Sequence, residues 1–186
     1  TEARLQQSIA QFVKSIHSFD SRYDEGRARV NNNNANFPNF STDENAGKSL
    51  FMTAPNNGGA GCNACHRAPE FDIRPGSNHN GIFRVAGSNT EFDLTNTRSP
   101  SLRDLAQPDG TPNGPFMHDG SLATLLDVVN HYDAIQAPAA NPPRNQFLNT
   151  IDNRLRPGGN LQNLNLTNAE KAQLVAFMEN TGFRRV

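Results

Sequence analysis

The apolar residues of the chain recur at helical spacing in four segments, and no segment shows a sustained alternation of apolar and polar residues. The first segment runs from residue 3 to about residue 22, and the last begins near Thr167 and ends before Gly182. The stripe on the first segment consists of Leu5, Ile9, Phe12, Val13, Ile16 and Phe19. This pattern predicts an all-α fold.

Capping residues indicate where two of these helices begin. Ser41 with Glu44, and Thr167 with Glu170, have the capping-box spacing in which each side chain bonds the other's backbone N–H. A further helix is expected from about Ser121. Its broad apolar face comprises Leu122, Leu125, Leu126, Val128, Val129 and Tyr132.

Two long segments lack helical spacing. Residues 30–40 are rich in Asn and contain Pro38, which predicts a linker or a loop laid over a surface. Residues 68–115 are rich in Gly, Pro, Asn and Asp, and we expect an irregular loop with one short helix near residues 101–106. Such a long irregular segment is uncommon in a compact domain unless it wraps around something, such as a cofactor.

The composition fits a domain with a thin apolar core. Of the 186 residues, 35% are hydrophobic, and a buried macrocycle would supply the missing apolar surface. Lys and Arg number 17 against 18 acidic residues, so charge gives no reason to expect binding to nucleic acid. The sequence has no apolar run of the ~18 residues needed to span a bilayer.

The most specific motif is Cys62-Asn63-Ala64-Cys65-His66. This spacing is the attachment signature of c-type haem, in which both thiols form thioethers with the porphyrin and the adjacent imidazole binds the iron. A zinc site would need further Cys or His ligands at short spacing, and the chain has no third cysteine. A thioredoxin-like redox pair would need a βαβ setting, which the pattern lacks. The motif therefore predicts one covalent haem c with His66 as its proximal ligand.

The second iron ligand decides what such a haem does, because a sixth protein ligand favours electron transfer and an open face favours reaction with peroxide. Met117 lies in a loop about where simple cytochromes c place their Met, and it could equally fill a gap in the core. Tyr132 is on the apolar side of its helix, where a core tyrosine is the favoured reading of the residues alone. The candidates are Met117, His118, His131, Tyr132, Met178 and His79.

Several longer strings resemble the C-terminal half of the bacterial di-haem cytochrome c peroxidase superfamily. The resemblance runs almost from end to end. It includes Ser18-Phe19-Asp20-Ser21-Arg22-Tyr23-Asp24, Gly47-Lys48-Ser49-Leu50-Phe51, the Cys62–His66 motif, Thr97-Arg98-Ser99-Pro100-Ser101-Leu102-Arg103, and the stretch from Pro115 through His118-Asp119-Gly120 to Leu125.

The resemblance implies a domain organisation and a fold. Residues 1–30 would be the terminal helix and linker of an N-terminal haem domain that this chain lacks, and residues 31–186 would form the C-terminal cytochrome c domain. That domain would have a class I-like cytochrome c fold, with long irregular loops around one covalent haem.

The resemblance also changes the choice of distal ligand. The peroxidases usually have Met on the helix that follows His-Asp-Gly, and the equivalent residue here is Tyr132. Tyrosine at this place resembles the methylamine-utilisation branch, whose di-haem enzyme completes the tryptophan tryptophylquinone cofactor of a partner protein. By this likeness Tyr132 is the expected distal ligand, and Met117 becomes a contact in the haem pocket.

Three further roles follow from the resemblance. Arg103 matches an arginine that holds a haem propionate. The backbone carbonyls of Asn113 and Pro115 match ligands of a calcium ion, whose Asn side-chain ligand belongs to the absent domain. We interpret His118-Asp119-Gly120 as a hydrogen-bonded turn rather than as an acid–base group.

These observations lead us to expect an electron-transfer haem module of a di-haem peroxidase-like oxidoreductase. Its partners would be the N-terminal haem domain and a small soluble electron-transfer protein or a protein substrate, and the attachment chemistry implies a periplasmic location. Two alternatives predict other spectra. A free-standing peroxidase would have an open distal face and a high-spin ferric haem, and a mono-haem shuttle would use Met117 as its ligand.

Overall fold

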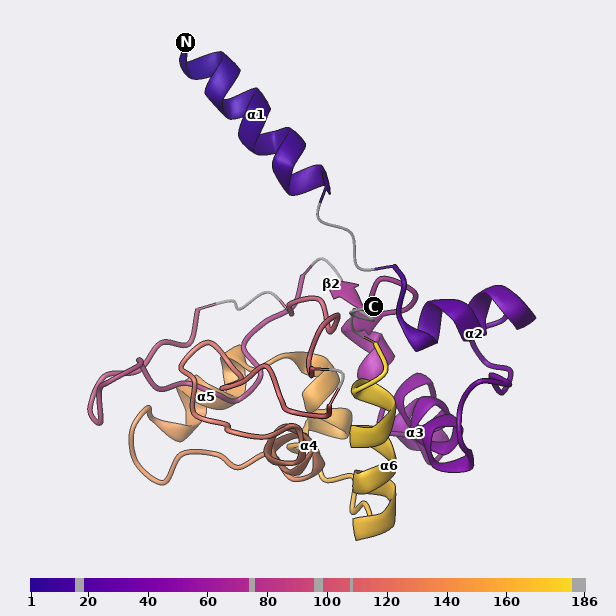
Figure 1. The fold of residues 1–186 in the computed structure, drawn as a ribbon. Helices are drawn as coiled ribbons and strands as arrows, with labels where there is room; N and C mark the ends of the chain where they lie inside the picture. Colours follow the sequence, from indigo (N-terminus) through magenta and orange to yellow (C-terminus); the bar gives the residue numbers. More distant parts are fainter. Residues whose placement is uncertain (16–18, 74–75, 96–98, 108, 182–186) are drawn as a thin grey trace.

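The computed structural model describes residues 1–15, 19–73, 76–95, 99–107 and 109–181 (Figure 1). Its α-helices and their bounds are α1 (Glu2–Ser15), α2 (Arg22–Val30), α3 (Thr42–Met52), α4 (Leu125–Asp133), α5 (Arg144–Thr150) and α6 (Asn168–Met178). The strands β1 (His66–Arg67) and β2 (Asp72–Ile73) pair antiparallel. The described chain is therefore rich in helix and poor in strand, as the pattern of apolar residues predicts.

Helix α3 packs closely against α6, and Gly47 permits this approach. A Cβ atom on Gly47 would lie 1.8 Å from the backbone carbonyl oxygen of Gln173 in α6, which is far inside van der Waals contact. Gly47 therefore stands in α3 because the backbones of the two helices meet at this position.

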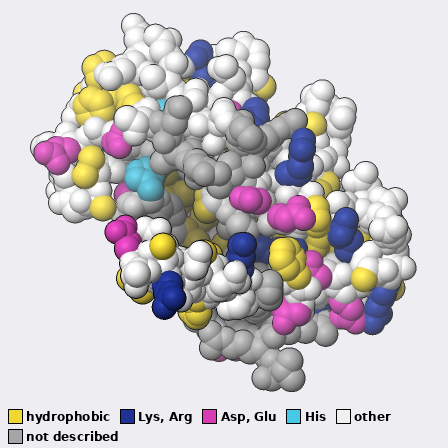
Figure 2. All heavy atoms as spheres, turned by 90° about the horizontal axis from the view of Figure 1, so that it is seen from above, with side chains coloured by type: hydrophobic (Ala, Val, Ile, Leu, Met, Phe, Trp, Pro, Cys, Tyr) yellow, Lys and Arg dark blue, Asp and Glu magenta, His cyan; other side chains and the backbone are white. Residues whose placement is uncertain are grey.

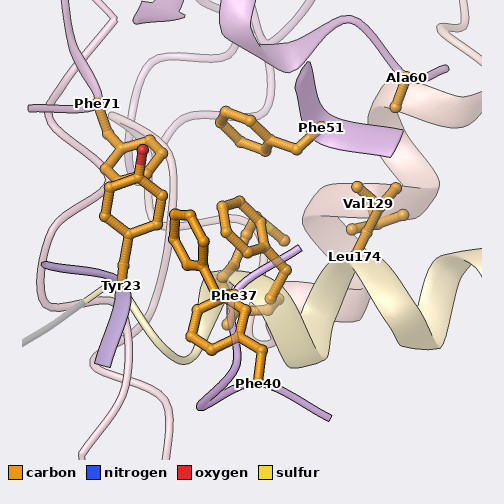
Figure 3. Close-up of a cluster of buried hydrophobic side chains, with 11 residues drawn as sticks. Tyr23, Phe37, Phe40, Phe51, Ala60, Phe71, Val129 and Leu174 are labelled. Carbon is orange, nitrogen blue, oxygen red and sulfur yellow. The ribbon is translucent and has the colours of Figure 1, made fainter. Parts of the chain in front are cut away.

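Aromatic side chains fill the core between α2, α3 and α6 (Figure 3). The ring of Tyr23 lies 4.7 Å from Phe71 and 5.2 Å from Phe37 between centroids, in tilted and edge-on arrangements that aromatic pairs prefer. A second apolar cluster surrounds α5 and consists of Ile135, Phe147, Ile151 and Leu155.

Helix α1 stands apart from the other helices and buries none of its residues (Figure 1). The predicted helix over residues 3–22 is confirmed as far as Ser15, Ile16 lies outside the described residues, and Phe19 and Asp20 are not helical. Helix α2 begins at Arg22, capped by Ser21 and Asp24. Because α2 places Tyr23 in the core, this part of the predicted N-terminal piece packs with the cytochrome-like domain; the boundary at residue 30 stays a prediction.

The Asn-rich segment is an irregular loop that covers the core, which agrees with the predicted loop laid over a surface and not with a free linker. Phe37 and Phe40 are buried in the aromatic core. The buried Lys48 of α3 donates hydrogen bonds of 2.7 Å to the carbonyls of Asn33 and Ala35, while the Asn45 side chain bonds the Phe37 backbone. Side chains of α3 thus accept from or donate to backbone groups of this loop that would otherwise lack hydrogen-bond partners beside the core.

The other predicted helix limits are confirmed in part. Capping boxes start α3 and α6 at Ser41 and Thr167, as predicted. The helix expected from Ser121 instead begins at Leu125, because Thr124 forms a capping box with Asp127. Residues 101–106 are not helical, and α5 was not predicted. Within the described chain, no helix is long and apolar enough to cross a bilayer.

Candidate haem-binding site

The two cysteines of the motif lie in a tight turn between α3 and β1. Residues 62–64 form a single 3-10 turn, in which the Cys65 N–H donates to the Cys62 carbonyl at 3.1 Å. The Asn63 side chain closes the turn by accepting from the Ala68 N–H. Both cysteines lie within the described chain and form no disulfide. Burial raises the pKa of the Cys62 thiol to about 12, so it stays protonated at neutral pH.

Backbone groups of Pro100 and Phe71 hold the His66 ring. Its Nδ1 lies 2.9 Å from the Pro100 carbonyl oxygen, which only accepts, so Nδ1 carries the proton. Burial lowers the pKa of His66, and the Pro100 hydrogen bond opposes this shift. A neutral imidazole with its proton on Nδ1 presents the Nε2 lone pair, as in metal-ligating histidines with a backbone partner.

Tyr132 and Met117 meet at one amide group, the side chain of Asn80. Asn80 Nδ2 lies 2.8 Å from Tyr132 Oη and 3.4 Å from Met117 Sδ. Burial raises the pKa of Tyr132, and the Asn80 hydrogen bond opposes that rise. Electrostatic interaction with Cys65 and Cys62 raises it further, so the phenol lies within electrostatic range of the attachment turn. The sequence analysis predicted that Tyr132 and Met117 lie near the haem, but it did not predict a role for Asn80.

The residues present fit a haem c. Two thiols in one turn and an imidazole with its proton on Nδ1 are the groups that the motif predicts, and the Tyr132 phenol is the donor that the resemblance implies. Hydrophobic side chains line the bottom of a recess beside a histidine in Figure 2.

Arg154 joins the attachment turn to the loop that carries Asn80, and sequence reasoning missed it. Its Nη1 donates to the Ala64 carbonyl at 3.1 Å, while Nε and Nη2 bind the carboxylate of Asp152 at 2.8 and 2.7 Å. Asp152 also accepts from the Asn78 N–H at 2.9 Å. No spacing or motif in the sequence marks Asp152 and Arg154, because the residues that they join, Asn78 and Ala64, are far away along the chain.

Arg103 lies on the α2 side of the domain, in a bidentate ion pair with Asp24. Its Nη1 and Nη2 lie 2.5 and 2.8 Å from the two carboxylate oxygens, and Nη2 also donates to the Pro69 carbonyl. The propionate contact stays a prediction. Since both terminal nitrogens already have partners, a propionate would share these donors.

The two residues predicted to bind calcium flank the cis peptide bond between Gly114 and Pro115. Both Asn113 and Pro115 are exposed, and the Asn113 side chain bonds Gln107 and the Asp104 carbonyl. The calcium site stays a prediction.

The remaining ligand candidates occupy other surroundings. A histidine in a loop rich in Gly and Asn is ordinarily solvated, but His79 is buried: its Nδ1 accepts from the Gly81 N–H, so its Nε2 donates to Thr150. Met178 is a core residue of the last helix, α6. His118 is exposed, and His131 Nε2 donates to the Asn80 carbonyl at 2.9 Å.

The comparisons with known proteins give related chains but no family model, since none matches. Methylamine utilization protein MauG of Methylophilus methylotrophus is 30% identical over 128 residues, which are 64% of this chain and 32% of the relative. MauG of Methylorubrum extorquens is 27% identical over 179 residues, or 92% of this chain and 42% of the relative. A cytochrome-c peroxidase of Denitromonas iodatirespirans is 36% identical over 87 residues, which are 47% of this chain and 18% of the relative.

A solved structure is similar over most of the chain. It is a MauG-like protein associated with microbial copper homeostasis, with a TM-score of 0.57 and 27% identity over 90% of this chain and 53% of the other. The chain thus spans less than half the length of the curated relatives it matches, and these relatives imply a haem c cofactor. These relatives and the solved structure support a likeness of this chain to the di-haem cytochrome c peroxidase superfamily, in its MauG branch.

Proposed function

We propose that this chain is the electron-transfer haem c module of a di-haem cytochrome c peroxidase-like oxidoreductase, and that it relays electrons or oxidising equivalents to or from a partner haem. The observation that supports the proposal is the attachment turn itself, in which Cys62 and Cys65 share one 3-10 turn and the proton of His66 lies on Nδ1, toward the Pro100 carbonyl. Two protein ligands leave no open iron position, which favours electron transfer over direct reaction with peroxide.

In this proposal four residues of the chain would hold the haem. Cys62 and Cys65 are the tethers, His66 is the proximal ligand and Tyr132 is the distal ligand. When bound, the haem supplies one-electron redox chemistry. A phenolate oxygen is a hard anionic donor, so Tyr132 favours ferric over ferrous iron and lowers the reduction potential relative to Met.

Helix α1 provides the surface for the proposed partner domain. Its apolar stripe of Leu5, Ile9, Phe12 and Val13 is 54–67% exposed, and such a stripe normally packs on another element. The N-terminal haem domain of the same enzyme is the proposed partner, and peroxidase chemistry belongs to the complete enzyme. Since haem c is attached outside energy-transducing membranes, we place the protein in the periplasm.

The test is an electron paramagnetic resonance spectrum of the purified ferric protein, after mass spectrometry has shown one attached haem. We expect a low-spin His/Tyr signal that disappears in Tyr132→Phe. Tyr23→Phe is the matched control, because Tyr23 bonds Asn33 in the aromatic core and should leave the spectrum unchanged. A Tyr132→Phe spectrum equal to that of the wild type contradicts the proposal.

The two alternatives give different spectra in the same experiment. A mono-haem shuttle with Met117 as ligand would show the near-infrared band of Met-ligated ferric haem in the wild type. It has one observation in its favour, since the Met117 sulfur lies beside Tyr132 on the Asn80 amide. A free-standing peroxidase would show a high-spin signal that cyanide converts to low spin.

A further inference from the structure

The turn around Asn80 is fixed from several sides. Asp152 accepts a hydrogen bond from the Asn78 N–H and donates its own N–H to the His79 carbonyl at 3.0 Å. The Gly81 N–H bonds the ring of His79, which is itself buried. A turn held at successive backbone groups presents the side chain between them in one direction.

The orientation of the Asn80 amide follows from its hydrogen bonds. Its Oδ1 accepts from the Ile82 N–H at 3.1 Å, so the NH2 group must face the other way. The two hydrogens of that group then point to Tyr132 Oη at 2.8 Å and to Met117 Sδ at 3.4 Å. One amide thus contacts both side chains that could reach the distal face of the haem.

Helix α4 holds the same turn from its opposite side. His131 Nε2 donates to the Asn80 carbonyl, and the His131 ring lies 5.0 Å from the ring of its neighbour Tyr132. Gly81 has a φ of +94°, a backbone conformation that other residues rarely adopt, and a Cβ there would lie 3.0 Å from Ile135, which follows α4. The backbone conformation of the turn therefore favours glycine next to Asn80.

Met117 has an unusual backbone for a non-glycine residue, with a φ of +71°. Its carbonyl accepts from the Gly120 N–H at 3.2 Å, which closes the turn that begins at Met117. A side chain kept on a left-handed residue is held in place by its surroundings, and such positions cluster at functional sites.

We infer that Asn80 is a positioning residue that would select the distal iron ligand: its amide bonds the Tyr132 oxygen, and it would keep the Met117 sulfur beside that oxygen as the replacement ligand. The inference rests on the proposed function. An amide N–H bonds an anionic oxygen more strongly than a thioether sulfur, so the amide favours Tyr132 over Met117.

The first test changes the amide without changing its shape. Asn80→Asp replaces the NH2 donor by a carboxylate oxygen, which faces the phenol oxygen and opposes its ionised form. We expect the ferric protein to lose the His/Tyr signal and to gain the near-infrared band of Met ligation. Asn89→Asp is the matched control on an exposed loop, where the Asn89 backbone carbonyl, which the substitution keeps, accepts a hydrogen bond from Arg84. It should give the wild-type spectrum.

The second test leaves Asn80 in place. In Tyr132→Phe we expect Met117 to bind the iron, and in Tyr132→Phe with Met117→Leu we expect a high-spin ferric signal. If Asn80→Asp does not fold, Asn80→Leu removes the same donors without charge and should again give the Met band.

The outcomes separate this inference from the proposed function. A wild-type chain without haem contradicts the proposed function. An Asn80→Asp or Asn80→Leu protein with attached haem and an unchanged His/Tyr signal contradicts the role of Asn80 alone. A Tyr132→Phe protein that is high-spin contradicts the replacement role of Met117.

Discussion

The guanidinium of Arg154 donates a hydrogen bond of 3.1 Å to the carbonyl oxygen of Ala64, inside the turn that carries both cysteines. The same guanidinium binds Asp152, whose side chain is only 6% exposed and also accepts from the loop that carries Asn80. Arg154 thereby ties the attachment turn to the loop that holds the proposed distal ligand.

We expect Arg154→Leu to destabilise the protein by about 2–3 kcal/mol, because it leaves the buried Asp152 carboxylate without its charge partner. Urea unfolding followed by circular dichroism measures the loss. The control is Arg144→Leu, on the exposed first turn of α5, which should change the free energy of unfolding by less than about 0.5 kcal/mol. Equal stabilities of the two variants would show that Arg154 does not hold the turn.

The ion pair between Asp24 and Arg103 gives stability that depends on pH. Burial alone would raise the pKa of Asp24, but hydrogen bonds from Arg103 and Ser21 and the charge of Arg103 together lower it below the ordinary 3.8. A carboxyl with a depressed pKa in the folded state stabilises fully above its unfolded pKa, and the stabilisation is lost as pH falls through the folded value.

The free energy of unfolding should therefore fall as the pH is lowered below about 4, and Asp24→Asn should reduce this slope. At pH 7 the variant should lose about 3 kcal/mol, since the Arg103 side chain is only 7% exposed. Asp20→Asn, four residues earlier and exposed, should keep the wild-type profile. Chemical unfolding at pH 7, 5, 4 and 3 measures the free energy of unfolding of each protein. Parallel pH profiles for the wild type and Asp24→Asn would refute a pH-dependent contribution of the ion pair.

Local signals explain which parts of the fold could be predicted. The capping boxes at Ser41 and Thr167 act within four residues, so the sequence alone locates the starts of α3 and α6. Burial of Phe37 could not be predicted, because it depends on Lys48 and Asn45 of a later helix bonding the loop backbone. No amphipathic spacing marks a loop whose partners come from another element.

The same distinction applies to the site. Covalent attachment needs Cys62, Cys65 and His66 within one turn. The residues on the proximal side of the proposed haem can therefore be identified from five consecutive positions of the sequence. The distal side brings Asn80 against Tyr132, 52 positions later, and Arg154 against Ala64, 90 positions away. Only the folded chain brings such residues together.

Gly47→Ala tests the close contact between α3 and α6. Alanine favours helix over glycine by about 1 kcal/mol, yet its methyl group would lie 1.8 Å from the Gln173 carbonyl oxygen. We expect a net destabilisation of about 2 kcal/mol or more, as in overpacked cores, measured by thermal unfolding. Ser49→Ala lies on the same helix and is exposed, so it should be neutral or slightly stabilising. A stabilised Gly47→Ala protein would mean that the helices are farther apart.

The apolar stripe of α1 should cause association of the isolated chain without adding to its stability. Ile9 and Phe12 are 54% and 67% exposed and belong to neither core cluster. We expect the wild-type chain to associate with increasing concentration in sedimentation velocity, since exposed apolar stripes associate. Ile9→Gln with Phe12→Gln should stay monomeric, with a free energy of unfolding within about 0.5 kcal/mol of the wild type.

Ser8→Gln on the same exposed helix is the control and should associate like the wild type. The added N-terminal haem domain should bind the wild-type chain and suppress its self-association, because both interactions would bury the same stripe, and it should not bind the double variant. A double variant that still binds this domain would place the domain interface elsewhere. A double variant that unfolds more easily would show that α1 packs on the body of the protein.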